Sequence, residues 1–177
     1  MSTKTGLTYA DYVAIPYDGL RHEIIDGDHF MNPGPNLYHQ HVSRHLQLQL
    51  LLKIELAGLG VVIDAPVDLQ LGEHDIVQPD LVFVSLARRW IMTPTRIKGV
   101  PDLVVEILSP SNSKHDTKLK RSLYERCGVP EYWIVFPEDH QLLQLVLVDG
   151  VYRETLCDSE VVMAVEPHTR VDLQKVW

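Results

Sequence analysis

Short apolar runs separated by turn residues dominate the middle and the end of the chain. The runs are rich in Val, Ile and Leu and are bounded by Gly and Pro, which is typical of buried β-strands. They cover residues 60–66, 67–72, 76–85, 101–108, 131–136, 142–148 and 151–156. This pattern predicts a sheet whose central strands are buried on both faces.

Helical periodicity occurs in three other places. We expect a short helix within residues 9–15 and a long one over residues 37–57, where apolar side chains recur at helical spacing. A third helix should end at Cys127, because Gly128 supplies a C-terminal stop. Helices and strands therefore alternate along the chain, which favours an α/β fold.

The amino-terminal part carries a hairpin signal. An Asp-Gly pair at residues 26–27 separates two short runs that suit β-strands. We find no internal repeat, low-complexity tract or linker. The sequence thus predicts a single domain over residues 1–177, with a central mixed sheet, flanking helices and an amino-terminal hairpin.

Composition and charge narrow the class of protein. The chain has 45% hydrophobic and 23% charged residues, as in ordinary globular proteins. The start of the chain lacks a secretory signal, and no run approaches the ~18 apolar residues of a membrane span. The two cysteines form no metal or redox motif. We therefore expect a cytoplasmic protein. The net charge of −8 argues against non-specific coating of nucleic acid.

Two carboxylates stand out among the predicted strands. Glu106 interrupts the apolar run 101–108, and an unpaired buried carboxylate is costly, so it needs a partner, a metal or access to water. Asp80 lies within the strand-like segment 76–85. Adjacent strands that each present a carboxylate at one edge of a sheet make a site for Mg²⁺, which can activate water and stabilise charge on a phosphodiester.

The helix after Glu106 offers a cation. Asp116, Lys120 and Tyr124 are spaced four residues apart and share one face, whereas Lys118 points elsewhere. Ordinary structural roles remain open for each residue: Asp80 as a turn residue, Glu106 in an ion pair, and Lys120 as a solvated lysine. Only their combination points to catalysis.

The chain resembles a known family in three stretches. "QPDLVFV", "GVPDLVVEILSPS" and "DTKLKRSLYERCGVPEYWIV" closely resemble the Uma-two family of endonucleases, within the restriction-endonuclease-like superfamily that carries the PD-(D/E)xK signature. The match extends upstream through "RHEIIDGDHFMNPGPNLYHQHV" and covers the chain from about Tyr17 onward. The resemblance implies a restriction-endonuclease-like sheet.

The resemblance also assigns roles by position. It makes Asp80 and Glu106 the acids that bind Mg²⁺ or Mn²⁺, with the backbone carbonyl of Ile107 as a further ligand. Glu23 matches the upstream acid of the family, and His39 matches its early histidine, for which we assign no role. The implied activity is metal-dependent hydrolysis of phosphodiester bonds, most of all in DNA, by a homodimer.

One position departs from the superfamily signature. The signature places a lysine two residues after the second acid, where this chain has Leu108. Lys120 sits where the family supplies a lysine from the next helix, and Tyr124 would orient it or line the site.

Other functions remain open at this stage. The main alternative is a catalytically silent module that binds nucleic acid or protein on the same fold; the negative net charge and Leu108 favour it. A structural oligomerisation domain would explain the apolar strands but not Glu106. A basic group in the loop between the acidic strands is a candidate for phosphate contacts or ordinary surface charge: Arg88, Arg89, Arg96 and Lys98.

Overall fold

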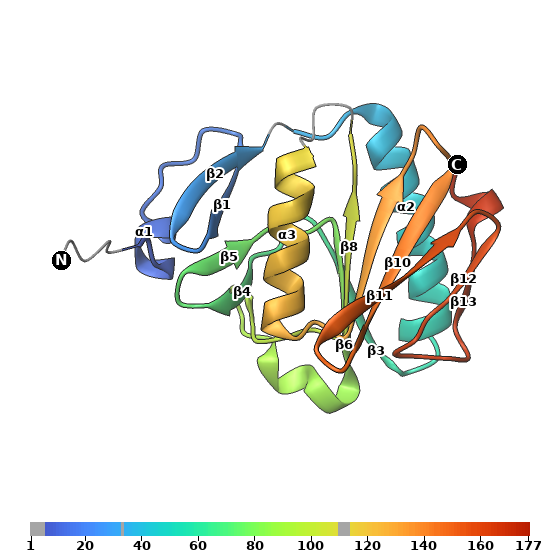
Figure 1. Ribbon diagram of the computed structural model, residues 1–177. Coiled ribbons are helices and arrows are strands. Elements are labelled where there is room, and N and C mark those ends of the chain that lie inside the picture. The colour runs from blue at the N-terminus through green and yellow to red at the C-terminus, as the bar shows by residue number, and fades with distance from the viewer. Residues whose placement is uncertain (1–5, 33, 110–113) are drawn as a thin grey trace.

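A six-stranded mixed sheet forms the centre of the molecule (Figure 1). The computed structural model describes residues 6–32, 34–109 and 114–177, with the backbone alone for 114–116. The strand order is β11-β10-β9-β8-β6-β3. The bounds are β3 Gly60–Asp64, β6 Leu81–Ser85, β8 Leu103–Ile107, β9 Glu131–Phe136, β10 Gln141–Val148 and β11 Val151–Cys157. Only β8 and β9 pair in parallel among these neighbours.

Two long helices cover opposite faces of this sheet (Figure 1). The helices are α2 (Leu37–Leu50) and α3 (Lys114–Cys127). Side chains of β6 point alternately to the two faces of the sheet, so both faces are apolar. Leu81 and Phe83 pack into the core beneath α2, and Val82 and Val84 pack into the core beneath α3. The predicted α/β fold with buried central strands is confirmed.

The predicted amino-terminal hairpin is also confirmed, but it belongs to a second sheet. Asp26 and Gly27 turn the chain with φ angles of 54° and 78°, as an Asp-Gly turn requires. The strand order in this sheet is β2-β1-β5-β4-β7. Its bounds are β1 Arg21–Ile25, β2 Asp28–Asn32, β4 Leu69–Gly72, β5 Asp75–Val77 and β7 Ile97–Lys98.

Segment 76–85 differs from the expected single strand. It forms the end of β5 and all of β6, which lie in different sheets. Pro79 lies in the connection, and proline cannot donate to a sheet ladder. Asp80 therefore lies immediately before β6 and not within a strand.

The three predicted helices are present, and the long one differs from the prediction in its last turn. The short helix α1 covers Tyr9–Val13, and the side chains of Thr8 and Asp11 cap it. The long α2 changes at Leu51 into a π-helix, η1 (Leu51–Glu55). The predicted end of α3 at Cys127 is confirmed.

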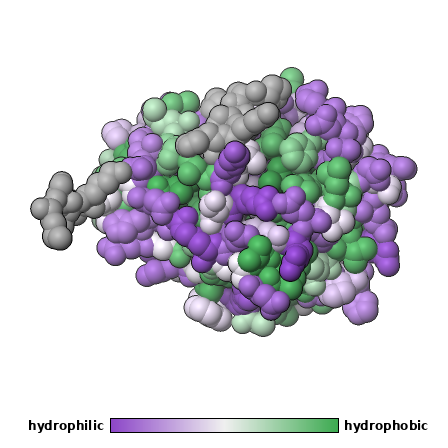
Figure 2. Space-filling view, in the orientation of Figure 1, coloured by the Kyte–Doolittle hydropathy of each residue, from purple (hydrophilic) through white to green (hydrophobic). Residues whose placement is uncertain are grey.

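The carboxy-terminal segment docks on the core beneath α2. Val171, Leu173 and Val176 are fully buried there. The remaining elements are η2 Leu86–Ile91, β12 Glu160–Val162, β13 Arg170–Asp172 and η3 Leu173–Lys175. Within the described part of the chain, we find no helix long and apolar enough to cross a membrane. Figure 2 shows a face where hydrophilic side chains predominate, with hydrophobic patches between them.

Candidate active site

The two acids lie at the same edge of the six-stranded sheet. Asp80 directly precedes β6, and Glu106 is the penultimate residue of β8. The strands are antiparallel, with Leu81 opposite Val105, so the start of β6 lies beside the end of β8. This topology explains how residues 26 positions apart come to face one space.

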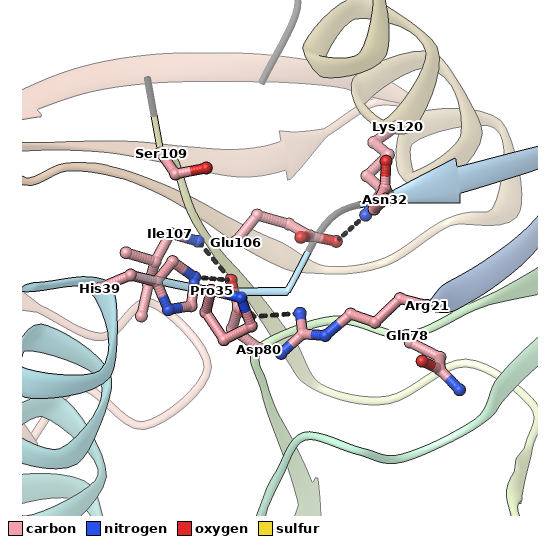
Figure 3. A pocket seen from close by; sticks show the side chains of 10 residues that line it. All are labelled: Arg21, Asn32, Pro35, His39, Gln78, Asp80, Glu106, Ile107, Ser109 and Lys120. Carbon is pink, nitrogen blue, oxygen red and sulfur yellow. Dashed lines mark hydrogen bonds and ion pairs between the residues drawn. The ribbon is translucent and has the colours of Figure 1, made fainter. Parts of the chain in front are cut away.

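Asp80 is buried and accepts hydrogen bonds on both oxygens (Figure 3). Its Oδ1 accepts from the Arg21 guanidinium at 2.8 Å, and its Oδ2 accepts from the backbone N–H of Ile107 at 2.8 Å. His39 Nε2 lies 3.0 Å from Oδ2. Burial alone would raise the pKa of Asp80, but His39 and Arg21 outweigh it and hold this pKa below its usual range.

Glu106 is buried on the face of β8 that packs against α3, because it alternates with Ile107 and lies two residues after Val104. Its Oε1 accepts a hydrogen bond from Tyr124 at 2.7 Å and one from Lys120 at 3.0 Å. Burial raises the pKa of Glu106 to about 8, although the charge of Lys120 opposes the shift. Burial also raises the pKa of Tyr124 well above its usual value, so its hydroxyl stays a donor.

Lys120 joins this acid to a second one. Its Nζ lies 2.9 Å from Glu23 Oε1, and its side chain is only 7% exposed. Glu23 also accepts from Asn32 Nδ2 at 2.7 Å and from the backbone N–H of Gln78 at 2.8 Å. The hairpin, the β5–β6 connection and α3 are thus tied together at Glu23.

Lys120 lies where it can take the place of the lysine that the superfamily signature expects at position 108. Leu108 packs partly buried against the core beneath α3, while Lys120 reaches Glu106 from the helix. The neighbouring Lys118 is exposed, as its different helix face predicts. The side chain of Asp116 lies outside the described residues.

These groups enclose a small cavity. We call it the acid cavity; it measures about 30 Å³, and its lining includes Asp80, Glu106, Ile107, Arg21 and Lys120 (Figure 3). That volume is about one water molecule's share of the liquid, so a single small cation fits.

The donor set also suits a hard cation. Two carboxylates share the acid cavity, and the hydrogen bonds that described residues donate to Glu106 all reach Oε1 and leave Oε2 for a ligand. Mg²⁺ uses one or two carboxylates and keeps several waters. Within the described residues no group of three or more His, Cys, Asp or Glu side chains could hold a metal ion, so a cation here would rely on water and backbone oxygen as well.

The structure brings together every residue that the sequence predicts for the site. Glu106, Glu23, Lys120 and Tyr124 form one hydrogen-bonded cluster, and Asp80 accepts from the backbone N–H of Ile107 beside it. Asp80, Glu106, Ile107 and Lys120 all line the acid cavity. His39, which the sequence left without a role, contacts Asp80.

Sequence reasoning missed Arg21, Asn32 and Gln78. A signal existed for Arg21: it lies two residues before Glu23 in a strand, so both side chains project from the same face. Asn32 lies opposite Arg21 in the hairpin register, which follows from the Asp-Gly turn.

The basic group at Arg88 does not flank the acid cavity. Arg88 Nε lies 3.4 Å from Asp102 Oδ1, beside the start of β8. Glu106 stands near the other end of that strand. Arg88 and Glu106 therefore lie near opposite ends of β8, and the length of the strand separates them because each strand residue adds about 3.3 Å.

The fold defines the class of protein. A solved structure described as "a putative nuclease belonging to DUF820 from Anabaena variabilis ATCC 29413" is 16% identical and matches with a TM-score of 0.80, over 96% of this chain and 97% of the other. At this identity the likeness shows a common fold, a mixed α/β arrangement with a central mixed sheet flanked by helices.

The family follows from the sequence itself. The model of the Uma2 family, described as "Putative restriction endonuclease", matches residues 9–174. The chain therefore belongs to the Uma2 family, and the resemblance seen in its motifs is confirmed. None of the curated proteins compared matches this chain.

Proposed function

We propose that the protein is a metal-dependent endonuclease that hydrolyses phosphodiester bonds of DNA. The observation that carries the proposal is the convergence of Asp80, Glu106 and Lys120 on the acid cavity from three different elements. Membership of the Uma2 family and the fold of a described nuclease support this reaction class. The choice of metal rests on the donor set of the acid cavity, and the choice of DNA rests on what the family resemblance implies.

In this proposal Asp80 and Glu106 hold Mg²⁺ or Mn²⁺, with the Ile107 carbonyl as a further ligand. When bound, the cation would activate water and stabilise charge on the phosphate. The low dielectric of a buried site strengthens such interactions.

The other residues of the cluster position a cation of the protein. Lys120 places its amino group at the edge of the acid cavity, where a positive charge can stabilise charge that develops on the phosphate. Glu23 and Glu106 hold its ammonium at 2.9 and 3.0 Å, and the Tyr124 hydroxyl fixes the shared Glu106 oxygen. Lysine can thus act from α3 although its backbone position differs from that of the signature.

A cleavage assay tests this function. Supercoiled plasmid is incubated with purified protein in Mg²⁺, in Mn²⁺ and in EDTA, with Glu106→Gln as the matched variant. We expect nicked or linear product with the wild type in either cation, and none in EDTA or with Glu106→Gln. Intact plasmid under all conditions, from protein that is folded by circular dichroism, would support the silent-module alternative.

A further inference from the structure

A larger hollow adjoins the acid cavity. We call it the α2 hollow; its volume is about 320 Å³. Arg21, His39 and Asp80 line both spaces, so the two lie next to each other. A chain molecule with one group at the acid cavity can therefore place a neighbouring group at this hollow.

One face of α2 lines the hollow with polar side chains. Gln40, Arg44 and Gln47 follow the helical i, i+4, i+7 spacing and all border it. Val42 and Leu46, on the other side of the helix, are fully buried in the core. Core packing therefore fixes the rotation of α2 and keeps the polar face toward the hollow.

Arg44 lines the α2 hollow and is available to a ligand. Its side chain is exposed, and it makes no hydrogen bond or ion pair with any residue in the described part of the chain. Five other arginines of this acidic protein pair with carboxylates: Arg21, Arg88, Arg121, Arg126 and Arg170. Arg44 remains unpaired although Asp64 lines the same hollow.

The spacing along α2 suits a nucleic acid strand. Arg44 follows His39 by five residues, which places it about 7.5 Å further along the helix axis. A strand of B-DNA rises about 3.4 Å per nucleotide along the duplex axis, and successive phosphates on its helical path lie further apart than this rise, so the separation corresponds to about one or two nucleotides. The planar guanidinium of arginine also matches the oxygens of a phosphate.

We propose that the α2 hollow binds a backbone phosphate of the DNA strand about one or two nucleotides from the phosphate that is cleaved at the acid cavity. Arg44 is its cationic ligand, and the amides of Gln40 and Gln47 flank it. Asp64 opposes the phosphate through its like charge. The contact positions the strand and carries no base specificity. This inference rests on the proposed function for its choice of ligand, but it concerns binding and not hydrolysis.

Binding in EDTA tests the inference without any cleavage. Anisotropy of a labelled DNA duplex is measured over a salt series from about 50 to 200 mM, a range in which phosphate contacts weaken strongly. We expect Arg44→Ala to weaken binding about fivefold or more and to reduce the slope of log K against log salt by about one. Asp64→Asn should tighten binding. The matched control, Arg153→Ala, removes an exposed arginine of β11 and should stay within about twofold of wild type.

Kinetics in Mg²⁺ give a second readout. Loss of a contact that is made equally in the ground and transition states raises KM and leaves kcat unchanged, so Arg44→Ala should raise KM alone. Equal affinities and salt slopes for Arg44→Ala and Arg153→Ala would overturn the inference, even in a protein that cleaves DNA. An Arg44-dependent slope in a protein that does not cleave would uphold it and refute the nuclease. Absence of DNA binding by the wild type would overturn it as well.

Discussion

Glu106 is a carboxylate in the middle of an apolar environment, and its neighbours explain why the fold tolerates it. Lys120 and Tyr124 both donate to its Oε1. Removal of one partner from such a buried pair leaves an uncompensated charge, whereas the complete pair is tolerated. An ion pair alone would explain Glu106, but it would not explain why Asp80 and Glu106 border one cavity of cation size.

At the scale of single residues, the clearest prediction concerns Lys120. Lys120→Ala should lower the rate of Mg²⁺-dependent DNA cleavage by about a hundredfold or more, because it removes a charge that stabilises the transition state. Single-turnover cleavage measures the effect, and calorimetry should show that Mn²⁺ still binds.

Lys118→Ala is the matched control, because it removes an exposed lysine from the same helix. It should cleave at nearly the wild-type rate. Equal rates for the two variants would refute the role of Lys120 and favour the silent-module alternative.

Helical and strand periodicity found most of the site from the sequence. The four-residue spacing placed Lys120 and Tyr124 on one face, and both now contact Glu106. Arg21 could not be paired with Asp80 in the same way. Their contact joins two sheets across 59 positions, and no local pattern encodes which loop ends meet.

Glu131 shows how one strand anchors a distant segment. It is fully buried at the start of β9, and four donors reach its carboxylate. Its Oε1 accepts from the Trp133 indole and the Gln144 amide, and its Oε2 accepts from the backbone N–H groups of Ala164 and Val165. The carboxylate thus fastens the segment after β12 to the sheet.

At the scale of elements, we predict that Glu131→Gln destabilises the fold by about 2–4 kcal/mol. The variant turns an acceptor into an amide NH₂, which faces donors and leaves them unsatisfied in the interior. Urea unfolding followed by circular dichroism measures the change. Glu160→Gln, which alters an exposed ion pair with Arg170, should change stability by less than about 1 kcal/mol. Similar midpoints for both variants would contradict the anchoring role.

Most elements could be predicted because burial and turns mark them locally. The exception is the segment 76–85, whose apolar residues lie in two sheets. Periodicity cannot reveal such a change of sheet; Pro79 was the only local sign. The short strands β7, β12 and β13 escaped prediction because two or three residues carry no measurable alternation.

At the scale of the whole molecule, the sequence predicts a homodimer. The carboxy-terminal segment is buried in its own chain through Val171 and Leu173. Exposed apolar residues instead occur on the hairpin β10–β11, with Val148, Val151 and Leu156 more than 40% exposed. We still expect light scattering at micromolar concentration to report twice the chain mass of 20.2 kDa. A mass near 20.2 kDa would contradict the dimer.

The central claim is that Asp80 and Glu106 together hold one divalent cation. Calorimetric titration with Mn²⁺ tests it most directly, on wild type, Asp80→Asn and the matched control Asp64→Asn, an exposed acid of the adjoining hollow. We expect one Mn²⁺ site per chain in the wild type, retained in Asp64→Asn and lost in Asp80→Asn. Unchanged Mn²⁺ binding in Asp80→Asn would show that the two acids do not share a cation.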